Sequence, residues 1–220
     1  MQRSPGSLLA VIVLGLAVRA DAQTGTIGTP PSSASVSMNG GGIRLQASEV
    51  LYSGLDGPYA AFDLGGGILG FDDYKTIADS GTVALDEVSF VGGTTFTGDP
   101  TDSNSLLEFQ FYNPDGSLAN AFDVVLPQSG NFIWTINELG GIGVPSEGFL
   151  QLVALNDTQG RWFLTQTPPT VGSNDPAVGD NNAGYNHGFE LVGAAVPEPG
   201  AVALMAGAGV GLLAFRRRRK

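Results

Sequence analysis

The chain has 220 residues, of which 14% are charged, 33 are glycine and none is cysteine. This composition is too apolar for bulk disorder and too rich in glycine for a helical bundle, and without cysteine there are no disulfides, thiolate metal sites or cysteine nucleophile. From Gln23 to Pro199 there are 20 acidic residues against Arg44, Lys75 and Arg161, a net charge of −17 that argues against nucleic-acid binding and favours cations as partners.

The first 22 residues have the pattern of a secretory signal peptide. Arg3 is basic, an apolar run extends from Leu8 to Val18, and the small-x-small triplet Ala20-Asp21-Ala22 follows. This run is short against the roughly 20 residues of a membrane-spanning helix, so we predict export through the general secretory machinery, with cleavage near Ala22, rather than an N-terminal anchor. Residues 23–35 lack hydrophobic periodicity and are predicted to form a flexible leader.

Residues 36–195 are predicted to form one all-β domain, an antiparallel two-sheet β-sandwich of jelly-roll-like form. Runs of β-branched and aromatic residues alternate there with Gly, Asp, Asn and Pro, and helical periodicity is missing. The expected strands are Ile43 to Tyr52, Tyr59 to Leu64, Thr82 to Val91, Leu106 to Asn113, Ala121 to Leu126, Asn131 to Leu139, Phe149 to Asn156, Arg161 to Thr165 and His187 to Val192.

Alternation within these strands predicts which side chains are buried. Every second residue is apolar in two of them, which predicts core positions at Leu107, Phe109, Phe111, Phe132, Trp134 and Ile136. In Thr82 to Val91 the apolar phase shifts, which predicts a bulge at Asp86-Glu87. The segment Asn113 to Ser117 has a Pro-Asp-Gly turn signal and predicts a hairpin.

Two patterns that resemble enzyme motifs do not support catalysis. Gly65 to Gly70 fits the spacing of a dinucleotide-binding loop, but the residues that follow leave no room for the helix that such a loop needs, so we expect a mobile glycine turn between strands. His187 is the single histidine, and no G-x-S-x-G motif accompanies it. We expect it to be a loop or strand-edge residue with ordinary hydrogen bonds.

Two acidic segments are candidate calcium sites, because hard oxygen ligands on flexible loops suit Ca²⁺. The first segment contains Asp72, Asp73 and Asp79, and the second contains Asn174, Asp175, Asp180, Asn181 and Asn182. Asp72, Asp73, Asp175 and Asp180 are the candidate ligands. Neither segment has EF-hand spacing, and solvated acids in turns are the favoured interpretation.

The adjacent aromatic residues Trp162 and Phe163 suggest a second kind of site. Neighbouring residues of a strand face opposite sides, so one of the two is expected in the core, and an exposed aromatic, with Tyr185 in a later loop, could stack on sugar rings.

The last 25 residues combine three features in a fixed order. A rigid Pro197-Glu198-Pro199 is followed by an apolar run from Ala201 to Phe215, which is about 22 Å long as a helix and spans a hydrocarbon core of about 30 Å only marginally. Five cations end the segment and would hold it in the cytoplasm by the positive-inside rule: Arg216, Arg217, Arg218, Arg219 and Lys220.

This tail, residues 196–220, resembles the PEP-CTERM sorting signal of Gram-negative bacteria. The resemblance implies recognition of Pro197, Glu198 and Pro199 by an exosortase, a transient stay in the inner membrane, removal of the tail, and residence at the cell surface or in extracellular polysaccharide. The chain is then the substrate of that processing enzyme, and the body is similar to the glycine-rich β-sandwich bodies of other proteins that carry the signal.

Taken together, these features predict a non-enzymatic exported protein with a structural or polysaccharide-associated role. A secreted hydrolase with the same tail is one alternative, and a tail-anchored membrane protein is another.

Overall fold

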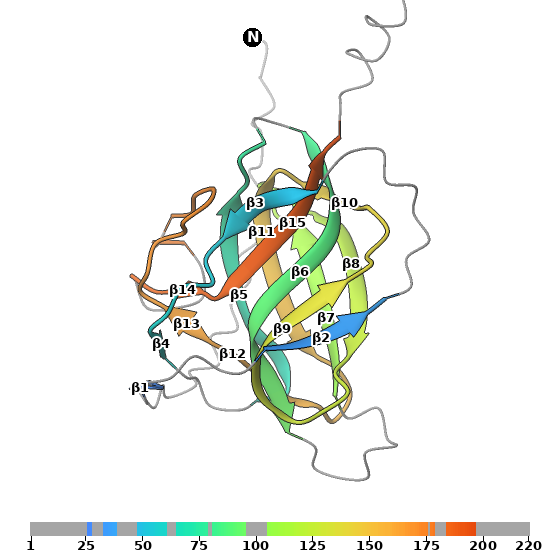
Figure 1. Ribbon diagram of the computed structural model, residues 1–220, viewed down its shortest axis with the longest axis vertical. Coiled ribbons are helices and arrows are strands. Elements are labelled where there is room, and N and C mark those ends of the chain that lie inside the picture. The colour runs from blue at the N-terminus through green and yellow to red at the C-terminus, as the bar shows by residue number, and fades with distance from the viewer. Residues whose placement is uncertain are drawn as a thin grey trace, which may run out of the picture.

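The computed structural model describes residues 26–27, 33–38, 48–60, 65–78, 81–95, 105–175, 177–178 and 184–196, and none of them is helical. The predicted signal peptide, most of the predicted leader and the predicted C-terminal helix lie outside these ranges. The all-β prediction for the body is confirmed, and the strands form three sheets (Figure 1).

The large sheet has the strand order β2-β9-β6-β15-β3, with β10 and β12 also paired to β6. Its strands are β2 (Ser33–Ser37), β3 (Glu49–Ser53), β6 (Thr82–Thr95), β9 (Gly130–Asn137), β10 (Ile142–Pro145), β12 (Gln159–Trp162) and β15 (Phe189–Ala195). The back sheet, behind the large sheet in Figure 1, has the order β5-β11-β7-β8. Its strands are β5 (Gly67–Lys75), β7 (Leu106–Tyr112), β8 (Leu118–Val125) and β11 (Glu147–Ala154).

The small sheet has the order β1-β4-β13-β14 and consists of two-residue strands. These are β1 (Thr26–Ile27), β4 (Tyr59–Ala60), β13 (Leu164–Thr165) and β14 (Asn186–His187). Tyr59 and Phe163 pack there on Val91, whose side chain points out of the large sheet. The small sheet therefore covers part of the outer face of the large sheet.

The large and back sheets share one hydrophobic core. Leu107, Phe109 and Phe111 of the back sheet are fully buried, as are Trp134 and Ile136 of the large sheet, while Phe132 is partly buried against the same core. The rings of Phe90 and Phe109 meet edge to face across the two sheets, with centroids 5.4 Å apart. Five of the six predicted core positions are therefore confirmed, and the sixth, Phe132, lies at the border of the core.

The two predicted local features are present. Val192 of β15 pairs with Glu87 and Gly193 pairs with Leu85, so Asp86 is the extra residue of a bulge in β6. The turn between β7 and β8 closes through the N–H of Gly116, which donates to the carbonyl of Asn113 at 2.9 Å.

One strand corrects the prediction for the glycine-rich segment. We expected a mobile turn from Gly65 to Gly70 followed by an acidic loop, but Gly67–Lys75 is the nine-residue strand β5, paired with β11. Gly70, Asp72 and Tyr74 face inward, and the residues between them are partly exposed. The segment has a low strand propensity by itself, and pairing with β11 supplies the backbone hydrogen bonds that make it a strand.

The predicted leader also differs from the structure. Residues 26–27 form β1, and β2 begins at Ser33, inside the segment expected to be flexible. Ala34, Val36 and Met38 pack against the core, which explains why this part is held. The pairing of β2 with β9 is parallel, whereas every other strand pair is antiparallel, so the all-antiparallel prediction is wrong for this one pair of the described strands.

Candidate functional site

The C-terminal tail follows directly after β15, an inner strand of the large sheet. β15 pairs with β6 on one side and with β3 on the other. The N–H of Val196, the residue after β15, still donates to the carbonyl of Thr82 at 3.0 Å. The predicted recognition residues Pro197, Glu198 and Pro199 and the five terminal cations lie outside the described residues, and the first of them follows Val196 without a spacer.

The predicted calcium ligands Asp72 and Asp73 lie in β5 and not in a loop, which corrects the sequence-based expectation. Asp72 faces inward and is 1% exposed. Its carboxylate accepts hydrogen bonds from the N–H of Asp73 at 3.0 Å and from the N–H of His187 in β14. Asp72 is therefore engaged by backbone donors in the interior, where a buried carboxylate needs such partners.

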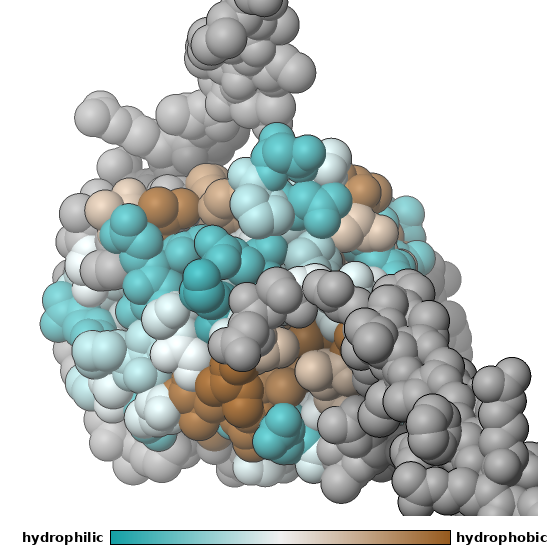
Figure 2. All heavy atoms as spheres, turned by 90° about the horizontal axis from the view of Figure 1, so that it is seen from above, coloured by the Kyte–Doolittle hydropathy of each residue, from teal (hydrophilic) through white to brown (hydrophobic). Residues whose placement is uncertain are grey.

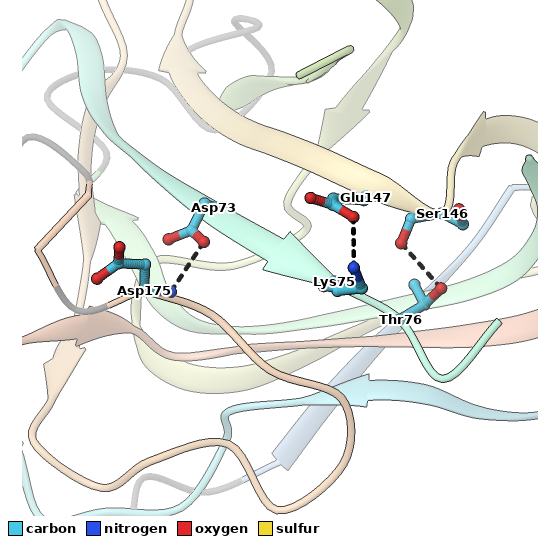
Figure 3. A network of polar contacts seen from close by, with 6 residues as sticks. All are labelled: Asp73, Lys75, Thr76, Ser146, Glu147 and Asp175. Carbon is cyan, nitrogen blue, oxygen red and sulfur yellow. Dashed lines mark hydrogen bonds and ion pairs between the residues drawn. The ribbon is translucent and has the colours of Figure 1, made fainter. Parts of the chain in front are cut away.

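Asp73 faces the other way and meets Asp175 (Figure 3). The N–H of Asp175 donates to Oδ2 of Asp73 at 2.9 Å, and Oδ1 of Asp175 accepts the N–H of Ala177 at 2.9 Å. Partial burial raises the pKa of Asp73, the hydrogen bond from Asp175 opposes this, and the negative charges of Asp175 and Glu147 add to the rise.

Asp73 and Asp175 are brought together by a short segment, Thr170–Ser173, that we call the edge strap. It joins the free edge of β3 to the free edge of β5: Ser53 exchanges hydrogen bonds with Thr170 and Val171, and Lys75 exchanges two with Ser173, all of 2.8 to 3.0 Å. The edge strap thus continues the hydrogen bonding from the large sheet to the back sheet. It was not predicted, because a single bridge to each strand, Val171 to Ser53 and Ser173 to Lys75, leaves no alternating pattern in the sequence.

Polar contacts beside the edge strap fix the end of β5 (Figure 3). The ammonium of Lys75 and the carboxylate of Glu147 form an exposed ion pair of 2.7 Å across β5 and β11. The hydroxyl and the N–H of Thr76 both donate to the carbonyl of Ser146, at 2.9 and 2.8 Å. These contacts connect the end of β5 to the start of β11.

The structure assembles only part of the predicted calcium set. Asp73 and Asp175 are adjacent, Asp72 faces the opposite side of β5, and Asp180 lies outside the described residues. Within the described ranges there is no group of three or more acidic or histidine side chains placed to hold a metal ion. Calcium binding stays a prediction, and Asp73 and Asp175 are the two candidate residues that the structure brings together.

His187 lies in β14, the edge strand of the small sheet, and its side chain is fully buried. Its ring stacks on Trp162, with centroids 3.9 Å apart and planes 17° apart. The indole N–H of Trp162 donates to the carbonyl of Gly188 at 3.2 Å. The histidine is thus held between the sheets rather than presented to solvent.

Tyr52 completes this buried polar group and was not predicted from the sequence. Its ring stacks on Phe189 with centroids 4.6 Å apart, and its phenol is fully buried. Burial raises the pKa of Tyr52, and the negative charges of Asp72 and Asp73 add to the rise. Its position in an apolar strand gave no sign of this environment, which the distant strand β5 creates.

The prediction that one of Trp162 and Phe163 is exposed and could stack on a sugar is wrong, because both side chains are only 1% exposed. Alternation does point the two side chains in opposite directions. Trp162 faces the main core, and Phe163 faces outward, where the small sheet covers it. Neither ring is available to stack on a sugar from solvent.

Comparison with known proteins identifies the tail. Residues 195–220 match the family model of the PEP-CTERM protein-sorting motif. No curated protein and no solved structure matches the chain. Among the described residues, no helix is long and apolar enough to cross a membrane. The chain carries a PEP-CTERM protein-sorting motif over residues 195–220, which marks it as an exported protein that is sorted through an exosortase.

Proposed function

We propose that this protein is a non-enzymatic component of the cell surface or of extracellular polysaccharide, with a β-sandwich body of structural role. The match to the sorting motif over residues 195–220 carries the proposal. The match begins at Ala195, the last residue of β15, so the sorting motif is joined to the body without a linker.

The physical properties of the tail fit sorting through a temporary stay in the inner membrane. Two prolines around Glu198 give a stiff, extended segment that an enzyme can recognise. The apolar run from Ala201 to Phe215 reaches about 22 Å, which is short for a permanent anchor. The terminal cations stop its passage through the membrane. These properties favour a processed intermediate over a permanent tail anchor.

The body offers support for a structural rather than a catalytic role. The single histidine, His187, is buried under the stacked ring of Trp162, where it cannot reach a substrate in solvent. Both tryptophans are also buried, so an association with polysaccharide would use polar surface groups and cations rather than stacking on tryptophan. The net charge of −17 from Gln23 to Pro199 favours such ionic contacts.

The test replaces Pro197, Glu198 and Pro199 with alanine in the native host. We expect the variant to keep its full mass and to remain in the inner membrane, since the apolar run and the cations still stop transfer while the enzyme finds no motif. Cell fractionation and intact mass measure the two effects. A matched control replaces Pro168 and Pro169, a proline pair of the body outside the motif, and should be processed like the parent. Release of the triple variant at the parent's mass would contradict the proposal.

A further inference from the structure

The last strand of the body restricts how far the body can move from a membrane that holds the tail. β15 pairs with β3 up to Gly193 and with β6 up to Ala195, and the N–H of Val196 donates to the carbonyl of Thr82. Four residues lie between Val196 and Ala201, where the apolar run begins, and the five steps from Val196 to Ala201 span at most about 18 Å even when fully extended. This step rests on the proposed function, in which the apolar run enters the inner membrane.

The end of the body that this short tether holds can be identified from strand pairing. Ala195 pairs with Val83 near the start of β6, Thr82 pairs with Pro145 at the end of β10, and β15 ends at the top of Figure 1. The end of β5 reaches the same place, because the N–H of Thr76, the residue after β5, donates to the carbonyl of Ser146 at 2.8 Å, and the N–H of Ser146 donates to the carbonyl of Gly81 at 2.9 Å. We call this the tail-proximal end, residues 48–50, 76–78, 81–82, 144–147 and 195–196.

Three large apolar side chains are exposed at the tail-proximal end. Val50 is 36% exposed, Ile77 is 49% exposed and Val196 is 45% exposed. The N–H of Ile77 donates to the carbonyl of Leu51, which places it beside β3. Figure 2 looks onto this end from above and shows apolar surface next to hydrophilic groups. Aliphatic side chains at such a face suit the boundary between lipid head groups and acyl chains.

We propose that, before the tail is removed, the tail-proximal end lies against the outer surface of the inner membrane, with Val50, Ile77 and Val196 in contact with lipid. The tether sets the distance, and the three apolar side chains make the contact. Glu49 and Glu147 lie at the same end, and Glu147 is paired with Lys75. Because anionic lipid head groups repel acidic side chains, the contact stays shallow. A second copy of the chain is a poorer occupant, because two bodies of charge −17 repel each other and nothing holds them together, whereas the short tether holds the body at the membrane despite its charge.

The experiment uses single cysteines, which the cysteine-free chain allows. The exported chain with its tail intact is reconstituted into phosphatidylethanolamine–phosphatidylglycerol vesicles that contain a lipid with a nitroxide head group. A fluorophore is placed at Ile77→Cys or, as the matched control, at Ile68→Cys. Ile68 is 62% exposed near the opposite end of β5, about 25 Å away. We expect the nitroxide lipid to quench the label at position 77 and to leave the label at position 68 unquenched.

Two further measurements separate the possible failures. Vesicle flotation reports whether the tail holds the membrane at all, and a chain that does not float overturns both the proposed function and this inference. A chain that floats with no quenching at position 77, or with equal quenching at both positions, overturns the inference alone. Insertion of about ten Gly and Ser residues between Val196 and Pro197 should abolish the quenching and keep the flotation. Cross-linking of position 77 to a second copy in place of quenching would show a dimer interface and overturn the inference.

Discussion

Asp72 of β5 accepts a hydrogen bond from the backbone N–H of His187 in β14, 115 positions later in the chain. This contact joins an interior carboxylate of the back sheet to the small sheet. A second backbone donor, the N–H of Asp73, bonds the same side chain. The small sheet therefore depends on a carboxylate from a different sheet for one of its backbone hydrogen bonds.

Replacing Asp72 with alanine should destabilise the body strongly. The change leaves two backbone donors without this acceptor in a buried place, and we expect the free energy of unfolding to fall by about 3 kcal/mol. Urea unfolding of residues 23–196 measures it. Asp123→Ala, on the exposed side of edge strand β8, is the control and should change the free energy of unfolding by less than about 0.5 kcal/mol. Equal losses for the two variants would show that the Asp72 contact does not stabilise the fold.

Glycine at position 172 should be needed for the edge strap. Its φ is +74°, and an added Cβ would lie 2.4 Å from the carbonyl oxygen of Lys75. Gly116 in the β7–β8 turn has a similar φ of +82°, but a Cβ there would meet nothing within 4 Å. Gly116→Ala should cost about 1–2 kcal/mol from the backbone conformation alone. Gly172→Ala should cost at least about 1 kcal/mol more, because the edge strap must also move. Urea midpoints that do not differ would argue against this role for the strap.

The features that could be predicted from the sequence depend on neighbouring residues. The turn from Asn113 to Ser117 uses Pro, Asp and Gly at positions that close a β-turn, and the bulge at Asp86 follows from the shifted apolar phase of one strand. The core positions of β7 and β9 follow from simple alternation. Each of these signals lies within about ten residues of sequence, where side-chain periodicity is informative.

The features that could not be predicted depend on partners far away in the chain. β5 contains two glycines, two adjacent aspartates and a single β-branched residue, Ile68, and only its pairing with β11 makes it a strand. Phe163 is buried because the small sheet, assembled from four distant segments, covers it. The same holds for the candidate site, since the contact of Asp73 with Asp175 spans 102 positions. The β2 strand is different, because the alternation of Ala34, Val36 and Met38 with serine was a usable signal.

Asp73 should make the stability of the body depend on pH. Partial burial raises its pKa above the ordinary 3.8, so the folded state binds this proton more tightly than the unfolded state. The ionised form therefore costs stability above the raised pKa, and this cost disappears as the pH falls through the raised pKa toward 3.8. Asp73→Asn should be at least as stable as the parent at pH 7, with a gap that closes in acid.

Urea unfolding of the parent, Asp73→Asn and Asp115→Asn from pH 7 down to pH 2 measures this gap. Asp115 provides a control of opposite sign, since its hydrogen bonds from Ser117 lower the pKa of its carboxyl. The ionised carboxylate of Asp115 therefore stabilises the folded state above pH 3.8, and this stabilisation is lost as the pH falls through the lowered pKa of the folded state. A gap for Asp73→Asn that widens in acid would contradict the raised pKa.

The intrinsic fluorescence of the body should not respond to polysaccharide. Trp134 is fully buried and Trp162 is 1% exposed, so emission should be blue-shifted and weakly quenched by iodide. Titration with the extracellular polysaccharide of the host should leave both properties unchanged, whether or not the polysaccharide binds to polar surface groups. Denatured protein, in which both indoles reach solvent, is the control for quenching. A saturable shift of the folded protein's emission would mean that a tryptophan contacts the sugar.

The terminal cations should have a different role from the Pro-Glu-Pro segment. Removal of Arg216 to Lys220 leaves an apolar run of fifteen residues with glycines at 207, 209 and 211, too short to hold firmly without charged side chains that reach the head groups. We expect this variant to leave the inner membrane early, with the tail still attached, whereas the Pro-Glu-Pro variant stays in it at full mass. The fraction of unprocessed chain in the membrane and in the medium, measured by fractionation and intact mass, separates the two roles. A parallel variant with all four arginines replaced by lysine keeps the charge and should be retained like the parent, because the positive-inside rule counts both cations. If the lysine variant escapes as the deletion does, retention depends on arginine side chains and not on charge, and the role assigned here to the cations is wrong.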